Sequence, residues 1–203
     1  DGGGSSCLFL KDFGPMNKNS DGTERAVGNG IYVVSTAPTD NTVTEIRSLQ
    51  TKVRLPRYGV FKPTFYGYNR YGVLVSRDVA GVKQTVDAKV GEVLADGSFF
   101  ASGNQSGVIT ASYNGATEKI EVELLPEAPV AIRLDSVLLD NKVTYPIEVQ
   151  TEVGGNVFNL YPGAMQWNVD DPSVCTVNEG VVKGLRNGTT IVTGRLGNFT
   201  DLL

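Results

Sequence analysis

The chain has 203 residues, a formal net charge of −4 at neutral pH and a calculated isoelectric point of about 4.9. This acidic balance argues against a nucleic-acid partner, because phosphate backbones are bound by clustered Lys and Arg side chains. The absence of His excludes a Ser-His-Asp triad and any metal site that needs imidazole ligands within this sequence.

The first 35 residues contain the blocks most typical of a ligand-binding loop. Asp1 is followed by consecutive glycines and serines, and a second block, Ser-Asp-Gly-Thr-Glu-Arg, ends at Arg25. Consecutive glycines let backbone N–H groups approach a phosphate oxygen closely, and serine hydroxyls add further donors. Asp1 offers a carboxylate for acid–base chemistry, and Arg25 offers a guanidinium for a bidentate phosphate contact. The candidate substrate-binding residues are the small residues of the first block: Gly2, Gly3, Gly4, Ser5 and Ser6.

Both blocks also have a plainer interpretation. Runs of Gly and Ser are most often flexible loops or linkers. The pair Asp21-Gly22 is typical of a solvated hairpin tip, in which case Glu24 and Arg25 are ordinary surface charges. The residue types alone leave both interpretations open.

Three blocks in this order, residues 1–6, 20–25 and 27–33, resemble the C-terminal end of the phosphodiester glycosidase family. That family includes the N-acetylglucosamine-1-phosphodiester α-N-acetylglucosaminidases, the enzymes that uncover mannose-6-phosphate tags. The sequence departs from the family pattern at three positions, where Thr, Pro and Ser are usual: Cys7, Ala26 and Gly28.

The resemblance implies that the parent protein hydrolyses a sugar-1-phosphodiester, releasing a sugar and leaving a phosphomonoester. It implies catalytic roles for Asp1 and Arg25, and we expect neither a metal nor another cofactor. Because the motif opens at Asp1, we expect roughly 200 further residues of catalytic domain upstream of it. A segment of some 35 residues cannot bury a core of its own, so we expect the chain alone to be inactive.

The same segment contains one predicted strand, at residues 28–34. Its β-branched and aromatic side chains point to both faces, and such a strand is costly to leave in water. We expect it to pair, together with residues 6–10, within the segment, against the following module or with another chain. Residues 11–23 are predicted to be loop.

The remaining sequence predicts strands, because no window keeps apolar residues at helical spacing. Short β-branched and aromatic runs alternate with Gly, Asn and Asp, which is typical of β-sandwiches. Proline-containing breaks at residues 36–42 and 125–129 divide the chain. The predicted strands are residues 30–35, 51–55, 73–76, 84–89, 108–113, 119–125, 130–135, 144–152, 164–169, 174–177, 181–183 and 189–193.

The last block contains a specific pattern. A run of Trp-Asn-Val-Asp-Asp-Pro-Ser-Val-Cys-Thr-Val begins at Trp167, followed by Gly-Val-Val-Lys-Gly from Gly180 and Gly-Thr-Thr-Ile-Val from Gly188. Together these blocks resemble the group 2 bacterial immunoglobulin-like domains. Residues 44–125 resemble that family more weakly and lack the tryptophan. We expect Trp167 to be buried between the two sheets of a sandwich.

The predicted fold class is therefore all-β, with two tandem immunoglobulin-like β-sandwiches preceded by a short β remnant of a catalytic domain. The predicted domains are residues 1–35 for the remnant, 44–125 for a divergent sandwich and 129–203 for a group 2 sandwich. The final strand of the second sandwich is expected to be cut short. Cys7 and Cys175 fall in different domains, so both are predicted to be free, buried thiols.

Residues 61–71 concentrate five aromatic and two basic side chains. Aromatic faces of this kind can stack on sugar rings. Alternation along a sandwich strand would instead place half of the rings in the core. We favour the core interpretation.

Taken together, the sequence predicts the C-terminal portion of a bacterial phosphodiester glycosidase, a hydrolase that is secreted, periplasmic or at the cell surface. The sandwiches would serve as spacer or docking domains, and the partner of the parent protein would be a glycan or sugar-phosphate. No membrane span is expected, since no apolar run approaches about 20 residues. One alternative is a cell-surface adhesion or carbohydrate-binding module built from immunoglobulin-like domains, and another is a purely structural stalk.

Overall fold

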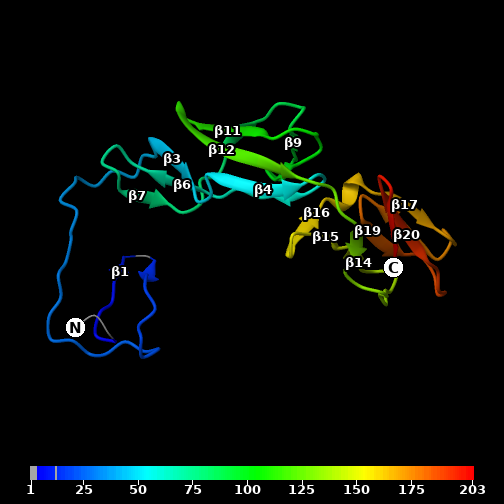
Figure 1. The fold of residues 1–203 in the computed structure, drawn as a ribbon, viewed down its shortest axis with the longest axis horizontal. Helices are drawn as coiled ribbons and strands as arrows, with labels where there is room; N and C mark the ends of the chain where they lie inside the picture. The colour runs from blue at the N-terminus through cyan, green and yellow to red at the C-terminus, as the bar shows by residue number, and fades with distance from the viewer. Residues whose placement is uncertain (1–3, 12) are drawn as a thin grey trace. The chain divides into compact units, whose positions relative to one another are not determined.

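The computed structural model describes residues 4–11 and 13–203 and consists of strands, with one short 3-10 turn at Pro162–Ala164 (Figure 1). The chain divides into two units, Asp1–Pro38 and Thr39–Leu203. The predicted all-β fold is confirmed. Within the described residues, no helix has the length and hydrophobicity that crossing a membrane would require.

The unit Asp1–Pro38 contains one small antiparallel pair, β1 (Phe9–Leu10) with β2 (Gly14–Pro15). The pair is closed by a turn in which the Phe13 N–H donates to the Leu10 carbonyl at 3.1 Å. Residues 6–10 thus contain a paired strand, as expected, but the partner is β2. The prediction that residues 11–23 are all loop is therefore wrong at Gly14–Pro15, where pairing with β1 makes a strand.

The strand predicted at residues 28–34 does not form, and Ile31 and Val33 are both 100% exposed. A strand of this kind needs a neighbouring strand and an apolar cover on each face. The only strands in the described part of this unit are the two-residue strands β1 and β2, which pair with each other. The run at residues 28–34 therefore has no neighbouring strand to pair with, despite the high β-propensity of its apolar residues.

The first half of the larger unit contains three sheets. One consists of β3 (Glu45–Ser48), β6 (Phe65–Tyr68) and β7 (Leu74–Ser76). The second, in the order β4-β12-β11-β8, consists of β4 (Lys52–Pro56), β12 (Ala116–Leu125), β11 (Gly107–Tyr113) and β8 (Lys83–Thr85). The third consists of β5 (Val60–Phe61), β10 (Phe99–Phe100) and β9 (Glu92–Val93). All pairs are antiparallel except β4 with β12.

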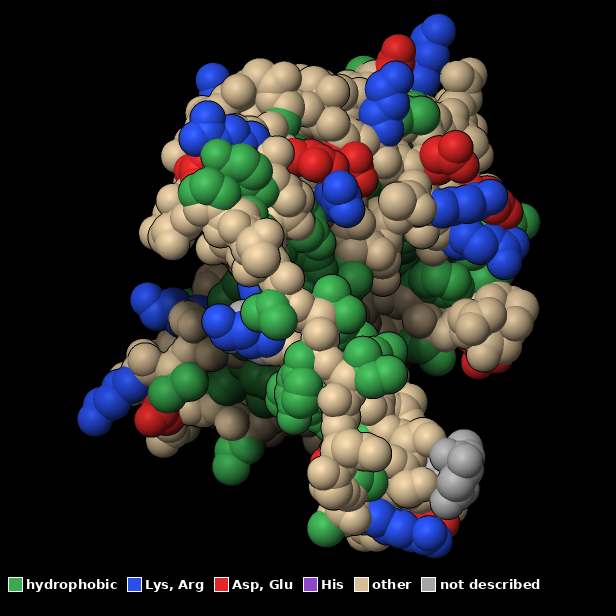
Figure 2. Space-filling model, turned by 90° about the vertical axis from the view of Figure 1, so that its left-hand side faces the viewer, with side chains coloured by type: hydrophobic (Ala, Val, Ile, Leu, Met, Phe, Trp, Pro, Cys, Tyr) green, Lys and Arg blue, Asp and Glu red, His purple; other side chains and the backbone are tan. Residues whose placement is uncertain are grey.

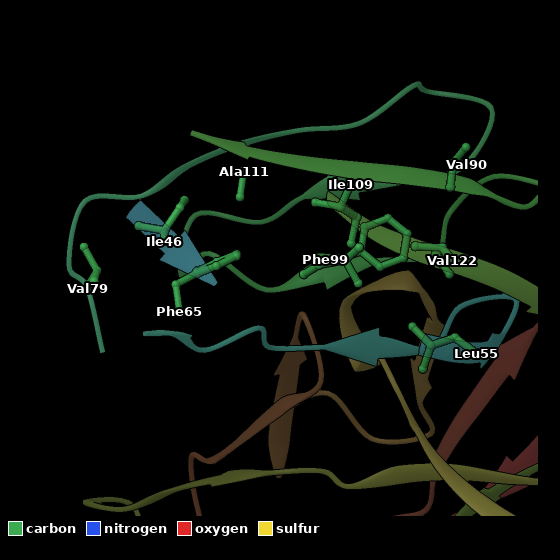
Figure 3. Packing of buried hydrophobic residues seen from close by; sticks show 11 residues of the cluster. Ile46, Leu55, Phe65, Val79, Val90, Phe99, Ile109, Ala111 and Val122 are labelled. Carbon is green, nitrogen blue, oxygen red and sulfur yellow. The ribbon is translucent and has the colours of Figure 1, made fainter. Parts of the chain in front are cut away.

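One hydrophobic cluster, which we call the first core, is built from these sheets. Alternation along β11 turns Ile109 and Ala111 inward and leaves Val108 40% exposed on the opposite face. Figure 3 shows the side chains of Phe99, Ile109 and Val122 pointing toward one another. Burial of each large apolar side chain contributes roughly 1.5–3 kcal/mol, which drives the packing of the sheets.

The aromatic run at residues 61–71 divides between the core and the surface. Phe65 and Gly67 of β6 are buried, whereas Tyr66 and Tyr68 are half-buried and occupy the alternate positions of the strand. The guanidinium of Arg47 lies over the Tyr68 ring, 4.6 Å from its centroid. The core interpretation therefore holds for the inward-facing residues of β6. The rings of Tyr66 and Tyr68 lie on the opposite, polar face of the sheet.

Ile109 and Val108 provide a matched pair for testing the first core. We expect Ile109→Ala to lower the free energy of unfolding by about 2–5 kcal/mol, because the deletion leaves a cavity in a fully buried site. Val108→Ala on the outer face should change it by no more than about 0.5 kcal/mol. Calorimetric or urea unfolding of both variants checks this, and equal effects would contradict the assigned inward face of β11.

The second half of the unit also contains three sheets. The first consists of β13 (Val130–Ile132), β15 (Val149–Val153) and β16 (Asn156–Leu160). The second consists of β14 (Thr144–Pro146), β19 (Val181–Gly184) and β18 (Cys175–Asn178). The third consists of β17 (Gln166–Val169), β20 (Val192–Leu196) and β21 (Phe199–Leu202). Their buried residues form a second cluster, the second core, which includes Val149, Leu160, Met165 and Val182.

The two cores draw their fully buried residues from opposite sides of the proline-containing segment at residues 125–129. The division of the unit into modules at residues 44–125 and 129–203 stays a prediction.

Trp167 lies at the rim of the second core, half-buried, which corrects the expectation of a central tryptophan. It pairs with Gly194 of β20, where an added Cβ would come within 2.7 Å of the indole ring. The indole ring therefore occupies the space that the missing side chain of Gly194 leaves open. Its Nε1–H donates to the Pro162 carbonyl at 3.0 Å, which places the polar edge of the ring at the rim.

Two hairpins are set by their turn residues. Asn114-Gly115 joins β11 to β12, with φ angles of 47° and 87°. Glu179-Gly180 joins β18 to β19 in the same way, with φ angles of 49° and 80°. Positive φ at both central positions is the two-residue hairpin turn whose twist matches that of the flanking strands.

The Asp-Pro-Ser segment after β17 is a turn, as its composition indicates. The Asp171 carboxylate accepts hydrogen bonds from the hydroxyl of Ser173 and from its backbone N–H, the latter at 3.0 Å, and lies 3.3 Å from Arg186 Nη2. The Ser173 hydroxyl above all, then the backbone N–H, holds the pKa of Asp171 below its ordinary value.

Asp171→Asn keeps the size of the side chain and an acceptor oxygen but removes the charge. Because the folded-state pKa of Asp171 is lowered, ionised Asp171 stabilises the fold above the unfolded-state pKa of about 3.9. That contribution is lost as the pH falls through the folded-state pKa. We expect the variant to be less stable than the parent at neutral pH and equally stable at about pH 2. Urea unfolding followed by the fluorescence of Trp167, the single tryptophan, measures this, and a difference independent of pH would refute it.

Candidate functional site

The predicted site lies in the unit Asp1–Pro38. Asp1, Gly2 and Gly3 lie outside the described residues. Gly4 is buried, Ser5 is half-buried, and Ser6 and Arg25 are exposed. Within the described residues, the predicted site therefore consists of the end of the glycine block, residues 4–6, and the second block, residues 20–25.

Gly4 is the point at which the two blocks meet. Its carbonyl accepts hydrogen bonds from the Asn19 side-chain amide at 3.2 Å and from the Arg25 backbone N–H at 3.4 Å. A Cβ at Gly4 would collide with the Asp21 carboxylate. Residues 15 to 21 positions apart in sequence are thus brought into contact, and the Asp21 carboxylate occupies the space beside Gly4 that a side chain there would need.

The charged groups of the second block are paired with each other. Arg25 Nη2 forms an ion pair with Asp21 Oδ2, and the Ser20 hydroxyl donates to the other Asp21 oxygen at 3.0 Å. The Arg25 side chain is 57% exposed, so its pair with Asp21 adds little stability. An exposed guanidinium can exchange a carboxylate for a phosphate oxygen with little desolvation, which makes Arg25 available to an anionic ligand at this surface.

Two asparagines that the sequence reasoning missed organise the loop. Asn17 accepts a hydrogen bond from the Leu8 N–H at 2.6 Å and donates to the Ser6 carbonyl at 2.9 Å. It also donates to the Asn19 side-chain oxygen at 3.0 Å, and Asn19 is only 8% exposed. The available signal was the Asn-Lys-Asn sequence just before the second block, since Asn side chains often bond to loop backbone.

Cys7 differs from its prediction. Both cysteines are free, but Cys7 is exposed, and only Cys175 is buried. The Cys7 thiol donates to Glu24 Oε1 at 3.5 Å, and neither hydrophobic cluster of the described residues includes a residue of this unit that could cover it. Partial desolvation first, and then the Glu24 carboxylate, raise the pKa of Cys7, which disfavours the nucleophilic thiolate at neutral pH.

In the part of the chain that the structure describes, no three His, Cys, Asp or Glu side chains gather as metal ligands. On the face drawn in Figure 2, Lys and Arg side chains alternate with Asp and Glu side chains. That face carries no continuous basic area of the kind that binds nucleic acid.

A cavity of about 350 Å³ lies in the second half of the larger unit. Buried Val174, Cys175 and Val182 line it, together with Leu138, whose side chain is 99% exposed. Burial raises the pKa of the Cys175 thiol, and the charge of Asp171 raises it further, so this thiol is not activated. Its lining mixes apolar side chains with polar and charged ones, and its cysteine is not poised for nucleophilic catalysis.

Gly4→Ala tests the contact between the two blocks. The new methyl group meets the end of a side chain, so we expect the Asp21 carboxylate to turn away and its ion pair with Arg25 to break. Backbone amide signals of residues 19–25 in a nitrogen–proton correlation spectrum should shift. Gly28→Ala is the control, because nothing lies within 4 Å of a Cβ there. Unchanged signals in Gly4→Ala, or the same changes in both variants, would show that the blocks do not touch.

No family model matches the chain, and no curated protein matches it. Several solved structures match 79% of it. The crystal structure of S-layer protein SbsC domains 4 and 5 matches with 17% identity, 96% coverage of that structure and a TM-score of 0.33. The S-layer protein rSbsC(31-844) matches with 19% identity and a TM-score of 0.31, and the chain spans only 27% of its length. A chimeric titin Z1Z2 matches with 12% identity, 94% coverage and a TM-score of 0.26. These likenesses are too distant to show a family, and the all-β fold rests on the strands of the chain itself.

Proposed function

We propose that this chain is the C-terminal portion of a secreted or surface-displayed bacterial phosphodiester glycosidase that hydrolyses a sugar-1-phosphodiester. The observation that carries the proposal is the contact of Gly4 with Asn19, Asp21 and Arg25. Independent linker and hairpin-tip segments would not be expected to share hydrogen bonds through the Gly4 carbonyl and to pack the Asp21 carboxylate against Gly4. The contact therefore favours a single ordered loop formed by both blocks over two independent segments in solvent.

The roles of the residues follow from the chemistry of the reaction. Cleavage of the bond between the sugar and the phosphate oxygen leaves a phosphomonoester, so negative charge grows on the phosphate. Arg25 is the residue proposed to balance that charge, while glycine N–H groups and the hydroxyls of Ser5 and Ser6 would bind the phosphate oxygens. Asp1 is the proposed acid–base carboxylate.

The exposed run from Ile31 to Val34 also supports the proposal. Four consecutive apolar side chains that are 78% to 100% exposed suit a strand that is covered on both faces in a larger sheet. Under this proposal that sheet belongs to the catalytic domain. Residues 39–203, with their two filled cores, would then be the spacer or docking part of the protein.

The complete reading frame provides the test. Its product should hydrolyse a sugar-1-phosphodiester such as UDP-N-acetylglucosamine, and Arg25→Ala should lower kcat/KM by at least about 100-fold, as expected for loss of a charged contact to the phosphate. Lys119→Ala, on the outer face of β12, is the matched charge-removal control and should leave turnover unchanged. A reading frame without a strand-rich domain before Asp1, or a product without turnover, would refute the proposal.

A cell-surface adhesion or carbohydrate-binding module is the second candidate function. It is favoured by the outward tyrosines of β6, Tyr66 and Tyr68, which give the sheet an aromatic surface. The same protein preparation separates the two candidates, because retention of the chain on immobilised glycans without any hydrolysis would support the binding module.

A further inference from the structure

Residues 56–59, which we call the strap, connect β4 to β5 in the first half of the unit Thr39–Leu203. Tyr58 in the strap has a φ of 68°, a left-handed conformation that bulky side chains rarely adopt. The strap is held from its own side, since Tyr58 N–H donates to the Ala101 carbonyl at 2.8 Å and Ala101 N–H donates to the Gly59 carbonyl at 2.9 Å. A strained residue held by the structure around it points to a role in that structure.

The other side of the strap pairs with the second half of the unit. The Tyr161 N–H donates to the Tyr58 carbonyl at 2.9 Å, and Gly59 forms an antiparallel bridge with Leu160 at the end of β16. Tyr58, the residue with the left-handed φ, is therefore also the residue whose carbonyl accepts the hydrogen bond from Tyr161. Backbone pairing thus crosses between strands that belong to different cores.

Side chains cross in both directions as well. Tyr58, from the first half, packs against the second core, and Phe158, from the second half, packs against the first core. The Phe100 ring lies 4.9 Å from the Tyr161 ring and 6.5 Å from the Tyr58 ring, measured between centroids. Each core is therefore completed by a residue from the other half.

The proline-containing connector, residues 125–129, also contacts the strap. Arg57 Nη1 lies 2.9 Å from Glu127 Oε1, and the Arg57 guanidinium lies over the Tyr58 ring, 4.8 Å from its centroid. Arg57 Nε is buried without a hydrogen-bond partner, a cost that the surrounding contacts offset. The ion pair holds the connector against the strap.

We infer that the strap, Phe158 and Tyr161 form an interaction surface whose partner is the other sandwich-forming half of the same chain. The surface makes residues 39–203 one cooperative folding unit. Two modules joined by a proline-containing linker alone would move and unfold independently. Here the unfolding of either half removes a packed residue from the core of the other and breaks the Tyr58–Tyr161 bond, so the two halves lose stability together. This inference does not depend on the proposed enzymatic activity.

The single tryptophan makes the coupling measurable, because Trp167 lies in the second half of the unit. Ile109→Val trims the first core on β11 without touching the strap. In the full chain, we expect thermal unfolding followed by Trp167 fluorescence to shift down by about 2–4 °C, together with the whole calorimetric transition. Val108→Ala, on the outer face of the same strand, is the matched control and should shift neither signal.

A second pair of variants tests the surface itself. Tyr58→Gly removes the crossing ring while allowing the left-handed turn, and Phe158→Ala removes the ring that crosses in the other direction. In the double variant, the shift that Ile109→Val causes at Trp167 should be lost, and calorimetry should show two transitions. The inference is overturned if Ile109→Val lowers a calorimetric transition in the parent chain while the Trp167 midpoint stays unchanged. It is also overturned if the double variant transmits the shift in full.

Discussion

Strand pairing under an apolar cover is the constraint on which this structure depends. A strand is stable only when neighbours satisfy its N–H and C=O groups and when a second layer covers its apolar face. β11 meets both conditions, since it lies between β12 and β8 and turns Ile109 into the first core. Residues 31–34 are also strand-forming types, but among the described residues they meet neither condition, and Ile31 and Val33 are left in solvent.

The same constraint explains how much of the fold could be predicted. Long runs joined by a clear turn, such as β11 and β12 around Asn114-Gly115, can be recognised in the sequence. Their β-propensity, their alternation of apolar and polar residues and their turn residues all indicate the same hairpin. Strands β5 and β9 were missed, because two residues carry no period and these strands exist only through pairing with β10. The longer strands β3, β16 and β21 were missed as well. The position of Trp167 was misjudged for a related reason, since the glycine that admits its ring stands on another strand.

For the candidate site, residue type indicated two blocks with suitable chemistry, but neither their contact nor what would hold them together. The glycine block and the second block were recognised by composition, and they are joined by hydrogen bonds to the Gly4 carbonyl. The side chains of Asn17 and Asn19 make hydrogen bonds that tie the two blocks together, yet polar residues of a loop give no signal of their bonding partners. Sequence patterns therefore indicate residues with suitable chemistry more readily than they indicate the hydrogen-bonding residues that hold those residues in position.

The strap changes what residues 39–203 can do for a protein that carries them. A spacer made of independent modules sets only a maximum distance, because each linker adds freedom of rotation. A spacer whose halves share residues across their cores sets a distance and a direction, since bending at the junction would expose Tyr58 and Phe158 together. The strained φ of Tyr58 is consistent with this role, because the chain keeps a costly conformation at the residue that accepts the bond between the two halves.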